Sequence, residues 1–406
     1  MTERRDYGDG AIDERKRHSD GSATYRLRYY LDGKRFTRTV RGTRAEAKRE
    51  LRRLVRSGDT GEHIAPDRIT LAQWISQWVA LLERKPDGEG IGRKRGLVNA
   101  RTLERYEELL RLHVMPTLGT RSLQKITASE IDTLYVDLER ELAPRTVHHV
   151  HVVLKACLNV AVRKGLISNN PAVKAEAPSP GESDAGTVLD EQQLTALVQG
   201  FKGTPLYGIV ATAAFTGARR NEVLALRWSD LSFEDKTLTI TRALEETKKH
   251  GRGTKEPKTA RGKRTIAIDD GIVAMFRTEH EKHLRIAAGV PDGAKVDLSL
   301  VKLADDALMF PGGDGTDFTK LRDAHAVTRS FVQRARKLGF PKLRFHDLRG
   351  THETLLLDAG VPVHVVAARC GHDPAVLLRS YAKRTKKADT RAADIIGAFS
   401  KSVLGG

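Results

Sequence analysis

Two short segments place an arginine one helical turn away from a second polar side chain. Arg219 and Glu222 are spaced i, i+3, so on a helix the carboxylate can orient the guanidinium. His346 and Arg349 share that spacing, which sets an imidazole beside a guanidinium. An arginine held in this way presents a planar fork that matches two phosphate oxygens. Taken alone, a pair such as Arg219 and Glu222 is more often an ordinary surface ion pair.

A lysine-rich segment offers a proton donor. Between Lys248 and Arg264 the chain has eight Lys and Arg and a single acid, Glu256. Within it, Lys258 follows Pro257 in a loop expected to join two strands. Such a basic loop could contact a phosphate backbone. Local evidence does not single out which lysine of this segment would be catalytic. The segment could also be a solvated basic loop without a catalytic role.

A histidine and a tyrosine lie close together near the C-terminal end of the sequence. Gly371 is expected to end one helix and Asp373 to cap the next, so His372 lies at their junction. Tyr381 follows nine residues later, near the end of that second helix. Its phenol can serve as a covalent nucleophile. A lone His or Tyr is more often a core or surface residue.

Other enzyme motifs are missing from the sequence. It has no Gly-x-x-x-x-Gly-Lys phosphate loop, no His-Glu-x-x-His zinc motif and no Gly-x-Ser-x-Gly elbow. Cys157 and Cys370 are the only cysteines, too few for a disulfide scaffold or a four-thiolate metal site, and they suit a reducing cytoplasm. We therefore expect phosphodiester chemistry without a metal or a cofactor.

The composition favours a polyanionic partner. The 406 residues include 70 Lys and Arg against 52 Asp and Glu, a net charge of +18, with 39% hydrophobic residues. Such an excess favours nucleic acid, although ribosomes or anionic membranes would also attract it. The first residues lack an apolar signal core, and the apolar stretch 206–215 is too short to cross a membrane. We expect a cytoplasmic protein and no membrane partner; the family resemblance described below would further imply a bacterial protein associated with the nucleoid.

The elements that must position these residues fall into three blocks, and the first is residues 1–64. Two alternating strands, 25–30 and 35–40, flank Asp32-Gly33, a strong hairpin signal. Thr43 and Glu46 form a capping box before a helix over 47–55. Residues 1–60 hold 17 Lys and Arg against 10 Asp and Glu. A basic strand face could enter a DNA groove, or it could be a solvated sheet face. The candidate DNA-binding residues are Arg26, Arg28, Arg35 and Arg38, of which Arg26 and Arg28 should share one face.

The second block, residues 65–178, is predicted to be helical. Capping residues at Thr70, Asn99 and Thr127 predict helices over 71–83, 101–114 and 131–140, and Pro144 in a first turn predicts a longer helix to about Lys164. Between the first two, residues 85–96 form a basic glycine-rich loop whose Arg93, Lys94 and Arg95 are candidate DNA contacts. Residues 169–181, rich in proline, are interpreted as an interdomain linker.

The third block, residues 179–406, is predicted to be a mainly helical α+β domain. A buried helix over 206–215 precedes strands over 237–241 and 265–268, which flank the basic loop. Helices return after Thr319 and continue to the end.

The motifs gain meaning from their order. Thr-Gly-x-Arg-x-x-Glu, Leu-x-Trp-x-Asp, Pro-Lys-Thr, His-x-Leu-Arg and Gly-His, followed by a tyrosine nine residues on, occur in turn over about residues 187–385. This order resembles the catalytic domain of the tyrosine recombinase (phage integrase) family. Residues 65–175 look like its helical core-binding domain, and residues 1–64 like the three-stranded arm-binding domain of larger integrases. Gly350 stands where many relatives carry His, and Cys370 where Leu is usual; neither is a catalytic position.

The resemblance implies a multidomain fold and a role for each matched residue. Arg219 and Arg349 would clamp the scissile phosphate, with Glu222 supporting Arg219. Tyr381 would attack phosphorus, giving a 3′-phosphotyrosyl bond and a free 5′-hydroxyl, and Lys258 would protonate that leaving group. His346 would assist proton transfer at the Tyr381 hydroxyl, and His372 would donate a hydrogen bond to the phosphate. No metal or other cofactor is implied.

The implied partners are double-stranded DNA with core-type and arm-type sites, three further copies of the chain in a tetramer, and accessory proteins. The accessory proteins would set the direction of excision and bend host DNA. Two other functions remain open. A type IB topoisomerase shares the nucleophile and the Arg/His/Lys set, and a catalytically idle DNA-binding regulator could keep the fold. The 25 residues after Tyr381 and the arm-like first block favour the recombinase.

Overall fold

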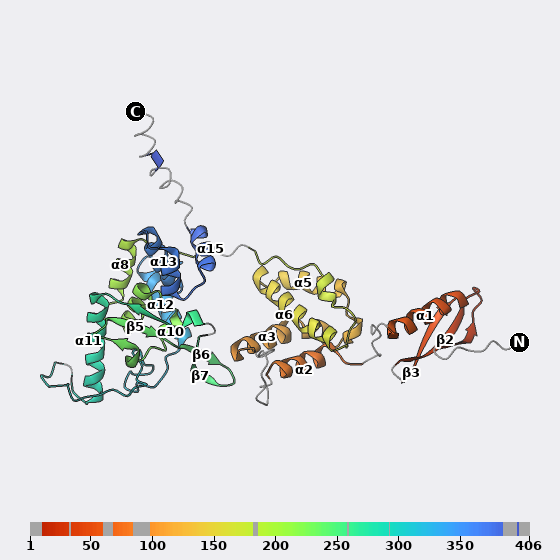
Figure 1. Cartoon of the computed structure of the whole chain (residues 1–406), viewed down its shortest axis with the longest axis horizontal. Helices are drawn as coiled ribbons and strands as arrows, with labels where there is room; N and C mark the ends of the chain where they lie inside the picture. The colour runs from red at the N-terminus through yellow and green to blue at the C-terminus, as the bar shows by residue number, and fades with distance from the viewer. Residues whose placement is uncertain are drawn as a thin grey trace. The chain divides into compact units, whose positions relative to one another are not determined.

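The computed structural model describes residues 10–31, 34–59, 68–83, 98–181, 186–257, 260–291, 293–384 and 396–397. The chain separates into two compact units, Met1–Glu182 and Ser183–Gly406, and each is described by itself (Figure 1). The predicted turn at Asp32-Gly33, the basic residues Arg93, Lys94 and Arg95, and Lys258 lie outside the described residues.

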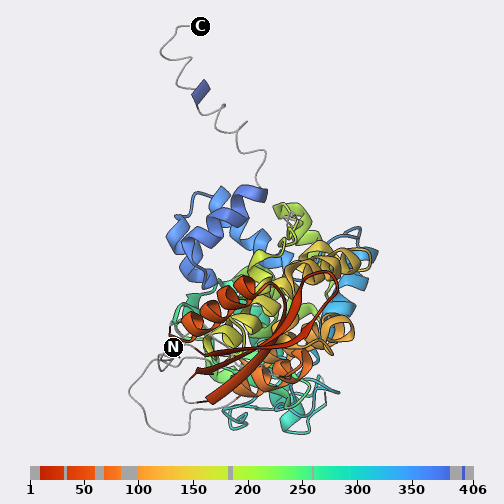
Figure 2. The ribbon, with the colours of Figure 1, turned by 90° about the vertical axis from the view of Figure 1, so that its right-hand side faces the viewer.

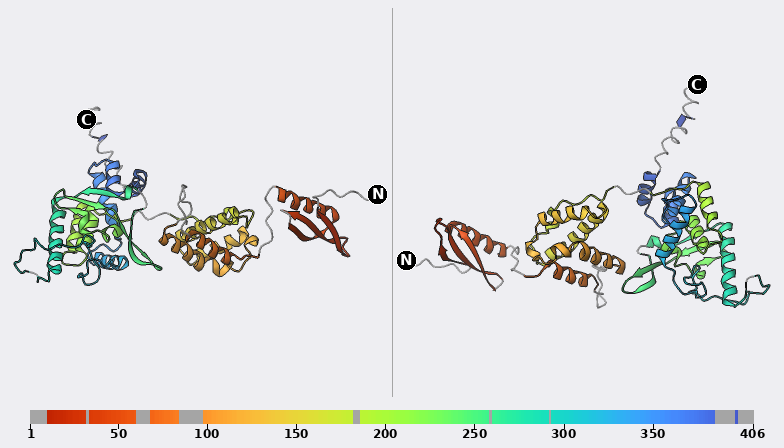
Figure 3. Two further views of the ribbon diagram at one scale, coloured as in Figure 1. Left: turned by 60° about the horizontal axis from the view of Figure 1, so that its bottom comes forward. Right: turned by 180° about the vertical axis from the view of Figure 1, so that it is seen from behind.

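The N-terminal part of the first unit is an antiparallel sheet covered by one helix. Its elements are β1 (Ala11–Arg17), β2 (Ala23–Leu31), β3 (Lys34–Gly42) and α1 (Arg44–Asp59), with sheet order β1-β2-β3. Tyr25, Leu27 and Tyr29 alternate along β2, and they are buried with Leu51 of α1. Figures 2 and 3 show α1 lying along this sheet. The predicted alternation and the capping box of Thr43 and Glu46 are confirmed.

The four candidate arginines of this sheet do not share one face. Arg26 and Arg28 alternate with the buried residues of β2 and therefore lie on the face away from α1. Arg35 pairs with Tyr30 across the ladder and shares that open face. Arg38 pairs with buried Leu27, so it lies on the helix side, where its Nη1 is 3.2 Å from Oε1 of Glu50.

The second part of this unit is a helical bundle. Its core contains Leu71, Trp74 and Ile131, and the Trp74 indole donates to the Cys157 carbonyl at 3.2 Å. The predicted caps at Thr127 and Asn99 are present. The elements are α2 (Leu71–Glu83), α3 (Ala100–His113), α4 (Met115–Leu118), η1 (Leu123–Lys125), α5 (Ala128–Glu139), α6 (Pro144–Arg163) and α7 (Pro171–Lys174).

The prediction that all of residues 169–181 form a linker is wrong, because residues 171–174 form helix α7. Asn170 caps this short helix through its side chain, and Pro171 occupies the first turn, where it needs no donor. Pro171 and Ala172 are buried, and Ala172 belongs to the core of the helical bundle. The residues that looked like chain breakers begin a helix, so the folded part of this unit extends to at least Lys174.

The second unit combines helices with two small sheets. In Figure 1, α13 lies between α8 and α15, and its residue Leu348 joins the main core. The helices are α8 (Glu191–Gly200), α9 (Tyr207–Thr216), α10 (Arg220–Val223), α11 (Asp270–Ala287), α12 (Ala324–Lys337), α13 (Asp347–Asp358), α14 (Val363–Cys370) and α15 (Pro374–Arg384), with the short 3-10 helices η2 (Trp228–Asp230) and η3 (Ala260–Gly262).

The strands of this unit form two antiparallel sheets. Strands β4 (Leu231–Ser232), β5 (Thr237–Ile240) and β8 (Arg264–Ala267) form one sheet in the order β4-β5-β8. The basic stretch between β5 and β8 is not simply a loop, because it contains a two-stranded hairpin, β6 (Ala243–Thr247) and β7 (Gly251–Lys255). Lys255 of β7 pairs with Glu245 of β6 at 2.5 Å. Acids of one strand thus neutralise bases of the other.

Two further observations complete the fold. Helix α11 was not predicted; it begins after Asp269, whose carboxylate accepts from the backbone of Gly271 and Ile272. None of the helices in the described part of the chain has the length and apolar character needed to cross a membrane.

Candidate active site

Arg349 forms the buried floor of the site. It lies in the first turn of α13, and its side chain is only 2% exposed. Its Nη1 donates to the Gly217 carbonyl at 2.6 Å, its Nη2 to the Cys370 carbonyl, and its Nε to Nε2 of His372 at 3.1 Å. Burial lowers the pKa of Arg349 to about 10, still far above neutral pH. The guanidinium therefore stays charged, and its orientation is fixed by two segments, the end of α9 at Gly217 and the junction after α14 at Cys370 and His372.

Arg219 lies at the rim of the same site. It is the residue before α10, and its side chain is 39% exposed. Its Nη1 donates to Glu222 Oε1 at 2.8 Å, as the i, i+3 spacing predicts. Its Nη2 donates to the Gly371 carbonyl at 3.4 Å. Arg219 thus contacts the loop that carries His372, while Arg349 contacts the turn that carries Arg219.

Glu222 is buried and bridges two arginines. Beside Arg219, it accepts from Nη2 of Arg264 at 2.8 Å, and the Arg264 side chain is only 6% exposed. Burial alone would raise the pKa of the Glu222 carboxyl, but the hydrogen bond and charge of Arg264, and those of Arg219, lower it to about 2. Glu222 is therefore ionised at any working pH. Sequence reasoning found Glu222 but missed Arg264, whose partner lies 42 residues away.

Two glycines make the crossed contacts possible. Gly217 ends α9 with φ 65°, and Gly371 ends α14 with φ 66°, a backbone region that favours glycine. A Cβ at Gly217 would approach the His352 ring to 2.7 Å. The carbonyls at these two helix ends accept from the guanidinium groups, at the negative ends of the helix dipoles.

His346 precedes α13 and lies near both arginines. Its side chain reaches solvent, yet the packed atoms around it lower its pKa by desolvation, and the charge of Arg349 lowers it further. The charge of Arg219 also lowers this pKa, more weakly. A neutral imidazole at this position can accept a proton.

His372 comes from the junction between α14 and α15, as predicted. Its Nε2 accepts from Arg349 and lies 2.8 Å from Oε1 of Glu353. Glu353 is one helical turn beyond Arg349, is buried, and places the same oxygen 3.0 Å from Arg349 Nε. Sequence reasoning missed Glu353, although its i, i+4 distance from Arg349 on a predicted helix was a usable signal.

Tyr381 occupies α15, but its hydroxyl is directed to another residue. It donates to Oδ1 of Asp358 at 2.8 Å. Asp358 ends α13, nine residues after Arg349, so these two positions are about 13 Å apart along the helix axis. The structure therefore brings Arg219, Arg349, His346 and His372 together and places the Tyr381 hydroxyl at the far end of α13. Asp358 was not anticipated from the sequence.

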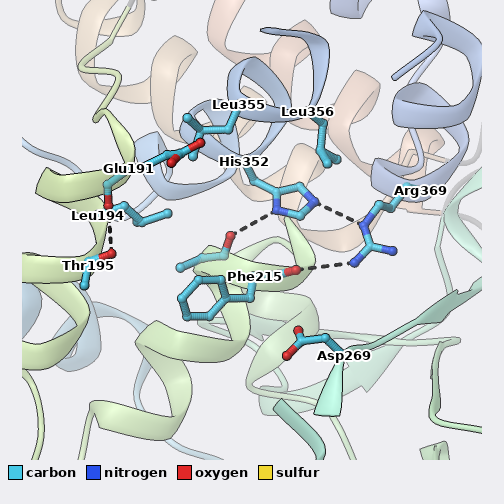
Figure 4. Close-up of a pocket in the computed structure, with 10 residues that line it drawn as sticks. Glu191, Leu194, Thr195, Phe215, Asp269, His352, Leu355, Leu356 and Arg369 are labelled. Carbon is cyan, nitrogen blue, oxygen red and sulfur yellow. Dashed lines mark hydrogen bonds between the residues drawn. The ribbon is translucent and has the colours of Figure 1, made fainter. Parts of the chain in front are cut away.

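A hollow of about 370 Å³ lies behind the site (Figure 4). His352 lines it, with Nδ1 3.1 Å from the Ala214 carbonyl and Nε2 accepting from Arg369 Nε at 3.2 Å. Burial lowers the pKa of His352 to about 4. These contacts fit a neutral ring with its proton on Nδ1, packed beneath Gly217.

The comparisons with known protein families agree with this geometry. The sequence profile of the "Phage integrase family" matches residues 187–388, and that of the "Phage integrase central domain" matches residues 89–177. Together they cover well over half of the chain.

Several characterised proteins are similar over most of their length. An integrase of Streptomyces ambofaciens is 26% identical over 391 residues, which span 92% of this chain and 91% of that protein. An integrase of Mycobacterium phage D29 is 24% identical, over 82% of this chain and 80% of the relative.

Solved structures share the fold at low sequence identity. A Tn1549 transposon integrase in complex with a circular intermediate DNA superposes with a TM-score of 0.61 at 20% identity, over 81% of this chain and 99% of that one. A lambda integrase dimer bound to a COC′ core site gives a TM-score of 0.55 at 18% identity, over 95% and 98% of the two chains.

Proposed function

Because this chain belongs to the phage integrase family, whose members are tyrosine recombinases, we propose that it is a site-specific integrase that cleaves and rejoins DNA to insert a phage or mobile element. The observation that carries the proposal is the crossed anchoring of the two arginines. Arg219 donates to the Gly371 carbonyl, and Arg349 donates both to the adjacent Cys370 carbonyl and to the Gly217 carbonyl two residues before Arg219, so the two guanidinium groups converge on the end of α14. Three arginines and two glutamates leave an excess positive charge before any histidine is counted.

A site of this charge suits a phosphodiester. Among the described residues, the bonds of Arg349 leave one N–H on each terminal nitrogen for a phosphate oxygen. Arg219 reaches in from the rim. The transition state carries more charge on the non-bridging oxygens than the ground state does, so fixed donors stabilise it selectively.

The proposed reaction is a transesterification. The Tyr381 oxygen attacks phosphorus, the new O–P bond forms, and the bond to the 5′-oxygen breaks. His346 takes the phenolic proton, and Lys258 supplies a proton to the leaving 5′-oxygen. His372 donates to a non-bridging oxygen. A 5′-hydroxyl from the partner strand then reverses these steps and releases Tyr381.

Tyr381 must move for this reaction. In the conformation described, its hydroxyl is bound to Asp358, so attack requires that bond to break and α15 to shift or bend. Helix α15 ends at Arg384, and residues 385–395 and 398–406 lie outside the described residues.

The proposed partners are DNA and other copies of the chain. Related integrases have been solved on DNA, and a lambda integrase tetramer has been solved bound to a Holliday junction. We propose the same classes of partner here, with core DNA bound by residues 65–178 and arm-type DNA by residues 1–64 through Arg26, Arg28 and Arg35. A directionality factor, a host DNA-bending protein and association with the nucleoid belong to the same proposal.

The test is capture of a covalent adduct. After the core site has been mapped by footprinting, the protein is incubated with a nicked suicide duplex of that site and analysed by SDS gel. We expect an SDS-resistant adduct that Tyr381→Phe abolishes, while Tyr135→Phe, at a buried tyrosine of the helical bundle, retains it. An adduct formed by Tyr381→Phe would contradict the mechanism. Relaxation of supercoiled plasmids without any core site would instead favour the topoisomerase alternative.

A further inference from the structure

Glu353 is a buried carboxylate to which neither the motifs nor the proposed reaction gives a role. Its side chain is 3% exposed. Its Oε1 lies 3.0 Å from Nε of Arg349 and 2.8 Å from Nε2 of His372. One oxygen atom thus contacts two of the groups that the proposed reaction directs at the scissile phosphate.

The charge of Glu353 is needed where it lies. Arg349 is almost fully buried, and a buried guanidinium without a counter-charge is costly. The carbonyls of Gly217 and Cys370 orient its terminal nitrogens but carry no net charge. Within the described part of the chain, Glu353 is the carboxylate at ion-pair distance from Arg349.

The position of Glu353 also determines which nitrogen of the His372 ring is available to the phosphate. A neutral Nε2 accepts from Arg349, and a protonated Nε2 can donate to Glu353. In either state Nε2 faces into the protein. Nδ1 is then the ring nitrogen left to donate toward a phosphate.

The arrangement mirrors that at the rim. Glu222 bridges Arg219 and Arg264 on one side, and Glu353 bridges Arg349 and His372 on the other. Residues 349 and 353 lie one turn apart on α13, so the helix itself sets their spacing. His372 comes from a separate segment, and Glu353 fixes that segment against α13.

We infer that Glu353 is a positioning residue for strand cleavage, which holds Arg349 and His372 in register with each other and itself contacts no DNA. The inference rests on the proposed function. Groups that act together on one phosphate lose much of their effect when displaced by about 1 Å, at a cost near 100-fold in rate. Removing Glu353 should therefore slow cleavage without weakening DNA binding.

The experiment measures single-turnover adduct formation by the full chain on the suicide core-site duplex, with DNA affinity measured at one fixed salt concentration. We expect Glu353→Gln to bind DNA within about twofold of the parent and to cleave roughly 10- to 100-fold more slowly. The matched control is Asp230→Asn, a buried carboxylate that contacts Arg242 at 2.5 Å elsewhere in the same unit. Its cleavage rate should stay close to that of the parent.

A double-mutant cycle separates positioning from general stability. Glu353→Gln is combined with His372→Ala. In that background Glu353→Gln should reduce the cleavage rate by a several-fold smaller factor, because one of the two side chains that Glu353 positions is already absent. An equal loss in both backgrounds would overturn the inference. If Glu353→Gln does not fold, Glu353→Asp is used instead. Its side chain keeps the negative charge but is one methylene shorter, so the carboxylate lies farther from Arg349 and His372. Cleavage at the parent rate by Glu353→Asp would overturn the inference as well.

The outcomes for the two proposals are distinct. A parent chain that forms no adduct contradicts the proposed function. An active parent whose Glu353 variants cleave at the parent rate contradicts the positioning role alone.

Discussion

Arg219 and Arg349 lie on two sides of one site and are held by different means. The rim arginine, 39% exposed, contacts a glutamate three residues along the chain and, through one longer bond of 3.4 Å, the Gly371 carbonyl 152 residues away. The buried arginine, 2% exposed, contacts carbonyls 132 and 21 residues away. The rim side can adjust to a substrate, whereas the buried side is part of the framework of the fold. The two arginines are thus chemically alike in the proposed reaction but structurally unlike.

The largest expected effect tests that difference directly. Arg219→Lys and Arg349→Lys should each reduce the rate of cleavage by about 10²- to 10³-fold, because lysine lacks the planar fork.

The alanine variants of the two arginines should differ in their free energy of unfolding. Arg349→Ala leaves Glu353 buried beside a cavity and should cost about 3–5 kcal/mol of unfolding free energy. Arg219→Ala should cost only about 1 kcal/mol, because Arg219 is itself 39% exposed and Arg264 still neutralises the buried Glu222. Urea denaturation measures both, and equal losses would remove the distinction between the two sides.

Acid should weaken the two sides at different pH. Folding lowers the pKa of His352, behind the buried side, to about 4 from an ordinary value near 6.5. Below pH 6.5 the unfolded chain therefore binds a proton that the folded chain does not, so stability falls as the pH drops toward 4, by roughly 3 kcal/mol. Glu222, at the rim, has its pKa lowered to about 2, so its contribution is complete above pH 4.5 and is lost only between pH 4.5 and 2.

The comparison of parent and His352→Gln isolates the first effect. Unfolding free energy is measured by urea denaturation at intervals from pH 7 to pH 4. The parent should lose unfolding free energy more steeply than the variant over that range, since the His352 imidazole, with its lowered pKa, is present only in the parent. Parallel curves would show that His352 does not titrate in this way.

The smallest effect concerns the nucleophile, which belongs to neither side in the conformation described. Asp358→Ala removes the acceptor that holds the Tyr381 hydroxyl, and an exposed hydrogen bond of this kind is worth about 1 kcal/mol. At saturating DNA, the first cleavage should accelerate by up to about fivefold. Asp306→Ala, which removes an exposed acid from a loop, controls for the change in charge. Slower cleavage by Asp358→Ala would mean that the bond assists attack.

The same contrast explains what could be predicted from the sequence. Helix starts were predicted correctly at Thr43, Thr70 and Thr127, because a cap and its partner lie three residues apart. The Arg219–Glu222 pair was found for the same reason. Family resemblance, rather than local pattern, singled out Tyr381 and His372.

Interactions between distant segments were missed. Arg264 meets Glu222 only in the folded domain, across 42 residues of sequence, and the β6–β7 hairpin depends on cross-strand pairs that no periodicity reveals. Glu353 is a different case, because its spacing from Arg349 was visible but its burial was not. The linker interpretation of residues 169–174 failed because proline and asparagine begin helices as readily as they interrupt them.

The glycines at the ends of α9 and α14 have a consequence for protein engineering. Both arginines are anchored on main-chain oxygen atoms, which no side-chain exchange can remove. Libraries that diversify the exposed positions of α14 can therefore leave the proposed phosphate clamp intact. The exceptions are Gly217 and Gly371, where any other L-residue would meet both an unfavourable φ and a neighbour within 3 Å. Designs for new target sequences should keep these two positions unchanged.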